Sequence, residues 1–182
     1  LAFTVDGHTS GADDLALTRA GPVVIEARIA ARLEPQISAE TEEIRQASTG
    51  EWASGWHLEK SRIGATREVM VDLIVNGEAV ARQPLLADGT PRTLKWRQHS
   101  AHSSWVAVRI LPSVHSNPVF VLIARQPIRA SKRSALWCRS CVDKVWEVKS
   151  PFMRAVERPA AHDAFEHARR TYEMITAQCD RA

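Results

Sequence analysis

Residues 103–123 read SSWVAVRILPSVHSNPVFVLI, two apolar runs joined by a polar corner. In the first run Val106, Val108 and Ile110 alternate with other side chains, which is the period of a half-buried strand. The second run, PVFVLI, is short and continuously apolar, as in a buried strand. The corner between them carries His115 and Asn117, so it holds either a site or only a tight connection between two strands.

The chain before this point repeats the strand pattern. Residues 22–34 read PVVIEARIAARLE, with apolar side chains at every second position and Glu26, Arg28, Arg32 and Glu34 on the other face. Residues 67–89 form two strand-like runs on either side of Asn76-Gly77, a dipeptide that fits a type I′ hairpin turn. Residues 35–55 are polar and predict a long loop with one helical turn near 39–46. Strands of this length and spacing predict an antiparallel β-sandwich, immunoglobulin-like in type, over residues 1–124.

The apolar period changes after Pro127. Residues 131–148 carry apolar side chains at 135, 138, 142, 145 and 146, a helical stripe that Ser131 is placed to cap. Further on, apolar residues recur at alternating spacings of four and three from Ala161 to Cys179. We therefore expect an α+β chain in which a β-sandwich (1–124) is followed by an antiparallel helix pair (125–182) packed on it.

Composition excludes some classes of protein. The 182 residues are 45% hydrophobic and 25% charged, and the net charge is +3. Residues 1–124 carry 12 basic and 14 acidic side chains, whereas 125–182 carry 12 basic and 7 acidic. The one basic run, RASKR at 129–133, is too short for a nucleic-acid surface, so we expect no nucleic-acid partner. The sequence contains no run of 18 apolar residues, so it predicts no transmembrane helix.

Three short motifs hold residues with catalytic or ligating side chains. WCRSC at 137–141 has the thioredoxin-type spacing, but Cys138 falls two turns into the predicted helix and lacks a βαβ setting. In HDAFEH at 162–167 the histidines are five apart, whereas zincins need them four apart. QHSAHSSW at 98–105 has two histidines without a partner cluster. We expect no catalytic, cofactor-binding or metal-ligating residue in this segment.

The six tryptophans leave a choice open. Trp52 and Trp56 stand in the predicted loop, where flat rings can stack on a sugar, as in a carbohydrate-binding module. The alternative is that they fill the ends of the sandwich, because tryptophan is buried on average. A small free-standing enzyme that uses the scattered histidines is a third interpretation.

Several long strings resemble one protein family. They are RLEP, ETEEIR, WHLEKSRIGATREVMVDLIVNGEAVARQPLLADG, SSWVAVRILPSVHSNPVFVLI, PIRASKRSALWC and VDKVW. Together they resemble the C-terminal region of CehA/McbA-type metallohydrolases, from about Phe3 to Tyr172. Those proteins carry a metal-binding hydrolase domain of the PHP fold before this region. The chain begins with Leu1, and we expect it to be the tail of a longer protein or a processed one.

The resemblance implies a division of labour. The PHP domain's ligands lie in His- and Asp-rich motifs such as H-x-H, and no H-x-H occurs here, so no catalytic residue is transferred to this chain. The divalent metal is expected in the absent hydrolase domain, which would be the partner of a non-catalytic accessory domain. Loops at a sandwich end commonly carry sites. The candidate interface or substrate-contact residues are Trp105, Arg109, His115 and Asn117.

Overall fold

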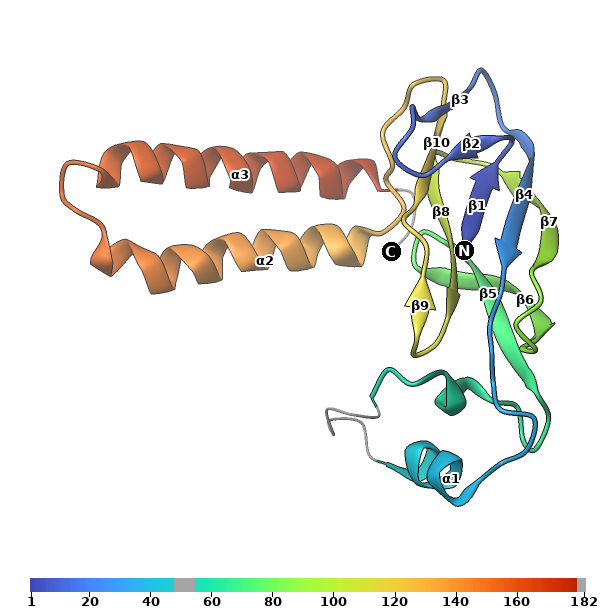
Figure 1. The fold of residues 1–182 in the computed structure, drawn as a ribbon. Helices are drawn as coiled ribbons and strands as arrows, with labels where there is room; N and C mark the ends of the chain where they lie inside the picture. Colours follow the sequence, from blue (N-terminus) through green and yellow to red (C-terminus); the bar gives the residue numbers. More distant parts are fainter. Residues whose placement is uncertain (48–54, 180–182) are drawn as a thin grey trace. The chain divides into compact units, whose positions relative to one another are not determined.

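The computed structural model describes residues 1–47 and 55–179, which form an α+β protein (Figure 1). The chain divides into two compact units, Leu1–Ile128 and Arg129–Ala182. The strands are β1 (Ala2–Val5), β2 (His8–Thr9), β3 (Leu15–Leu17), β4 (Gly21–Ile29), β5 (Glu68–Val75), β6 (Glu78–Leu86), β7 (Arg92–Ser100), β8 (Ser104–Ile110), β9 (Val114–His115) and β10 (Val119–Ile123). The helical segments are α1 (Ala39–Gln46), η1 (Leu58–Ser61), α2 (Lys132–Lys149), η2 (Ser150–Phe152) and α3 (Arg158–Gln178).

The strands of the first unit form two sheets. One has the order β2-β1-β4-β7, and the other has the order β3-β10-β8-β5-β6 with β9 paired to β8. The pairings are antiparallel except that of β3 with β10, which is parallel and aligns Leu15 with Val121. The expectation of a purely antiparallel fold was therefore wrong at this edge. The cause is that β3 is only three residues long and pairs with a segment about a hundred residues away, so no turn signal reveals it.

The core comes from alternation in both sheets. Along β4 and the residues after it, every second side chain from Val23 to Leu33 is buried, as the sequence predicts. These side chains form one cluster with Val69, Val71 and Val108 of the other sheet. The first unit is thus sandwich-like, with one continuous apolar layer between its sheets.

The predicted hairpin turn is confirmed. Asn76 has φ 52° and Gly77 has φ 94°, the left-handed conformation that a type I′ turn requires at both positions. The Asn76 side chain also accepts a hydrogen bond from the Trp105 backbone N–H at 3.0 Å. The turn therefore fixes the β5–β6 hairpin against the neighbouring strand β8.

The second unit consists of α2 and α3 with the short turn η2 between them. Ser131 caps α2 as predicted, because its hydroxyl accepts the Ser134 N–H at 3.1 Å. The rings of Trp146 on α2 and Phe165 on α3 lie 5.0 Å apart, so the helices contact each other through these side chains. Val145, which the predicted stripe included, is instead 47% exposed. Over the described helices, none is both long and apolar enough to span a bilayer.

Candidate binding groove

A groove lies over β8 and the corner that follows it. Its volume is about 510 Å³, and most of the side chains that line it are apolar. The lining residues are Trp56, Ile74, Gly77, Trp105, Ala107, Val108, Arg109, Leu111, Pro112, Val114, His115, Ser116, Asn117, Pro118 and Phe120. All of them belong to the first unit.

Strand alternation places the apolar floor of the groove on the side of the sheet away from the core. Val106, Val108 and Ile110 of β8 belong to the core cluster, so Trp105 and Ala107 project from the opposite face. Ile74 of β5 pairs with Ala107, and both side chains are buried although neither belongs to that cluster. The six-stranded sheet thus carries an apolar patch on its outer face as well, which is unusual because the outer face of such a sheet is commonly solvated and polar.

The corner 114–118 forms one wall of the groove. Ser116 fastens it to β8 twice, because its N–H donates to Val108 O at 2.8 Å and its Oγ accepts the Val108 N–H at 3.1 Å. His115 pairs with Arg109 in the β8–β9 ladder, and its Nδ1 lies 3.1 Å from Ser116 O. The ring of His115 therefore engages the backbone of its own corner and is exposed along the groove edge.

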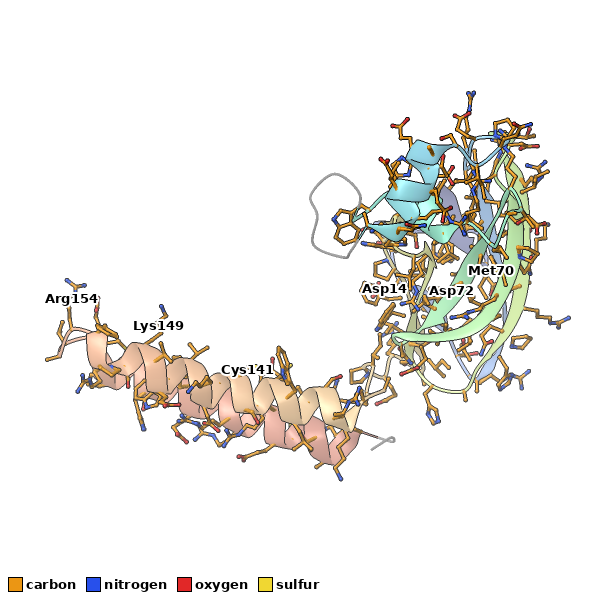
Figure 2. The ribbon with its side chains drawn as sticks, turned by 90° about the horizontal axis from the view of Figure 1, so that it is seen from below. Asp14, Met70, Asp72, Cys141, Lys149 and Arg154 are labelled. Atoms are coloured by element: carbon orange, nitrogen blue, oxygen red, sulfur yellow. The ribbon has the colours of Figure 1, made fainter. Side chains whose placement is uncertain are left out.

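A charge cluster adjoins the groove on the same face. The carboxylate of Asp72, labelled in Figure 2, is buried and pairs with two arginines from the neighbouring strands. Arg109 Nε lies 3.1 Å from one oxygen and Arg82 Nε lies 2.9 Å from the other. Two guanidinium groups share one carboxylate, so the cluster keeps a net positive charge beside an apolar floor. An anionic or polar group of a ligand would be attracted to this edge.

The loop that carries Trp56 also lines the groove. Ser61 of η1 donates a hydrogen bond from its hydroxyl to Leu111 O, which ties this loop to the corner 114–118 through the end of β8. His57 begins η1, because its Nδ1 accepts the Glu59 N–H at 3.1 Å. The Trp56 side chain is 78% exposed, so the loop presents a flat apolar ring to solvent at the groove.

A buried ion pair anchors this loop. Arg62 donates to both carboxylate oxygens of Glu59, at 2.5 and 2.6 Å, and to the backbone oxygens of Glu34 and Thr66 at 2.8 and 3.0 Å. The Arg62 guanidinium holds the pKa of Glu59 below its ordinary value, and the carboxylate raises the pKa of Arg62. Two arginines join the ends of the excursion from Leu33 to Arg67, because Arg62 donates to Glu34 O and Arg67 Nε donates to Leu33 O at 2.8 Å. The ion pair with Glu59 holds the Arg62 guanidinium in place for this contact.

The structure brings all four candidate residues together, since Trp105, Arg109, His115 and Asn117 all line the groove. The sequence prediction missed Ile74 and Phe120. Their signal was available in principle, because each is a large apolar residue at an outward position of a strand. Trp52 lies outside the described residues, so its predicted role in a loop stays a prediction.

No family model, curated protein or solved structure matches the chain. The remaining candidates from the sequence do not form a cluster. Cys138 and Cys141 are free thiols within α2, and Cys138 is well inside the helix, as expected. His162 packs its ring 5.6 Å from that of Trp146. Within residues 1–47 and 55–179, no three His, Cys, Asp or Glu side chains converge in a way that could hold a metal ion.

Proposed function

We propose that this chain is the non-catalytic accessory domain of a PHP-type metal-dependent hydrolase, and that the groove over β8 binds the hydrolase domain. In this proposal the divalent metal belongs to that hydrolase domain. The proposal includes an immunoglobulin-like sandwich and an antiparallel helix pair packed on it. The resemblance of the long strings from RLEP to VDKVW supports the family assignment.

The observation that carries the proposal is an apolar groove that faces solvent with a positive edge. Phe120 is 42% exposed and Trp56 more so, and both border the groove. Interfaces between proteins are enriched in aromatic residues and arginine at their buried centres. The groove is lined by side chains of both kinds, namely Trp56, Trp105, Phe120 and Arg109. Soluble proteins seldom leave a large contiguous apolar patch without a function.

The first test is the coding sequence upstream of Leu1, where we expect an open reading frame with an H-x-H motif. The segment it encodes is then expressed separately and titrated with this chain in a calorimeter. We expect Phe120→Ala to weaken binding about tenfold or more, because each ~1.4 kcal/mol lost is a factor of ten. Val24→Ala is the matched control, since Val24 is as exposed as Phe120 but lies on β4 and does not line the groove. An upstream segment without metal ligands, or no heat of binding, would refute the proposal.

The alternative is a carbohydrate-binding module. The observation that favours it is that Trp56 and Trp105 line the same groove, as two rings that could stack on sugar faces. Tryptophan fluorescence during titration with oligosaccharides tests it. Saturable quenching that Trp56→Ala abolishes, and that Val24→Ala preserves, would support this alternative over the hydrolase partner.

A further inference from the structure

The two most exposed large apolar side chains among the described residues belong to one short segment. Phe152 is 85% exposed and Val156 is 82% exposed, more than any other large hydrophobic side chain that the structure describes. Both belong to the connection between α2 and α3, at one end of the helical unit (Figure 1). Side chains exposed to this degree pack on neither helix, so packing within the unit does not account for them.

Basic side chains stand next to these two residues. Residues 149–158, here called the 149–158 turn, read KSPFMRAVER, with three basic side chains and one acidic one, a net charge of +2. Arg154 pairs with Glu157, and the Arg154 side chain is still 77% exposed. Figure 2 shows Lys149 and Arg154 at this end of the helical unit. The 149–158 turn therefore combines exposed apolar side chains with an excess of positive charge.

The middle of the two helices has no such excess. Arg139 pairs with Asp143 and, at 3.2 Å, with Glu173 on the other helix. Arg169 pairs with Asp143 at 2.7 Å and also with Glu166. In this network two arginines meet three carboxylates, so it does not attract an anionic surface as the 149–158 turn does.

The backbone of the 149–158 turn is held by its own hydrogen bonds. The carbonyl of Ser150 accepts the Met153 N–H at 3.3 Å and Arg158 Nη2 at 3.0 Å. The carbonyl of Arg154 accepts the N–H groups of Glu157 and Arg158 at 3.0 and 3.2 Å. Backbone polar groups that leave water need partners, and these bonds supply several of them. The turn can therefore enter a less polar environment without losing these bonds.

We propose that the 149–158 turn inserts its apolar side chains into the surface of a bilayer that contains anionic lipid. Apolar residues flanked by Lys and Arg suit the boundary between headgroups and acyl chains, where cations are attracted to anionic headgroups. A turn of this size is too small for the roughly 800 Å² that each partner buries in a standard protein interface. A bilayer surface is deformable and needs no complementary pocket. This inference concerns a different surface from the groove over β8 and does not depend on the proposed function.

Co-sedimentation of the full 182-residue chain with lipid vesicles tests the proposal. We expect binding to vesicles of equal parts phosphatidylserine and phosphatidylcholine, little binding to phosphatidylcholine alone, and weaker binding as salt screens the charges. Phe152→Ala should weaken binding about tenfold, because the ring no longer leaves water. Lys149→Gln should weaken it about fivefold, because one cation is lost at the surface.

The matched controls lie at the other end of α2. Leu136→Ala removes an apolar side chain that is 50% exposed, and Lys132→Gln removes an exposed cation at the first residue of the helix. We expect both variants to bind like the wild type. Helicity by circular dichroism checks that all four variants fold. Controls that weaken binding as much as Phe152→Ala and Lys149→Gln would overturn the proposal.

A second measurement asks whether the turn enters the bilayer. Phe152→Cys is labelled with an environment-sensitive fluorophore in a Cys138→Ser, Cys141→Ser, Cys179→Ser background, and Leu136→Cys in the same background is the reference. Anionic vesicles should shift the emission of the label at 152 to shorter wavelength and leave that at 136 unchanged. A label at 152 that stays in water, or equal binding to both kinds of vesicle, would overturn the proposal. A wild-type chain that binds neither kind would leave the turn to a protein partner and would overturn it as well.

Discussion

Replacing Arg62 by methionine should destabilise the first unit severely, because Arg62 is the fully buried partner of Glu59. The variant leaves the Glu59 carboxylate buried without its cation, which typically costs about 3–5 kcal/mol. It also removes the donors to Glu34 O and Thr66 O, each worth about 1 kcal/mol when the carbonyl is left without a partner. These terms overlap, so we expect a total loss of about 4 kcal/mol, a large share of a domain's stability.

Urea denaturation at pH 7, followed by tryptophan fluorescence, measures this loss as a shift in midpoint at constant slope. The control is the double variant Arg62→Met, Glu59→Leu, in which both charges are gone. It should regain about half or more of the lost stability, because the apolar pair avoids the cost of an unpaired buried carboxylate. A single variant that loses less than about 1 kcal/mol would refute the reasoning, since a loss of that size is typical of an exposed ion pair. So would a double variant no more stable than the single one.

Three further predictions concern the same unit. Gly77→Val should cost about 1 kcal/mol or more, read as a lower urea midpoint, because φ at this position is 94° and a β-branched residue resists it. Ser116→Ala should cost about 1–3 kcal/mol by the same assay, because the Val108 N–H loses its buried acceptor; an unchanged midpoint would contradict this. The stability gap between wild type and Glu59→Gln should be full above the ordinary carboxyl pKa of 4.5 and shrink as the pH falls below it, because the folded-state pKa of Glu59 is lowered; a gap constant from pH 7 to 3 would count against the assigned cause.

The features that could be predicted from the sequence are those that depend on residues adjacent in the chain. The alternation from Val23 to Leu33, the turn at Asn76-Gly77 and the cap at Ser131 each depend on a few adjacent side chains, and all three are present in the structure. The helical turn near 39–46 is likewise α1. Local periodicity and local hydrogen bonds determine these features, so they can be predicted without knowing which distant residues they contact.

The features that escaped prediction join residues far apart in the chain. The Arg62 contact with Glu34 O spans 28 residues, and the Ser61 contact with Leu111 O spans 50. The groove itself combines Trp56, Ile74 and Phe120, which come from three separate segments. No pattern within one segment predicts that these residues line the same groove. The four predicted residues of the groove were found because they are close in sequence, on β8 and in the corner after it.

The parallel pairing of β3 with β10 constrains the order in which the sheet can form during synthesis. During synthesis β3 emerges early, but its hydrogen-bonding partner, Val121–Ile123, is made more than a hundred residues later. The hairpin β5–β6 can form from neighbouring residues long before that. In the nascent chain, β3 therefore stays unpaired until β10 has been synthesised. A chain truncated before β10 cannot form this pairing at all. It would keep β3 unpaired and leave an open sheet edge of the kind that promotes aggregation.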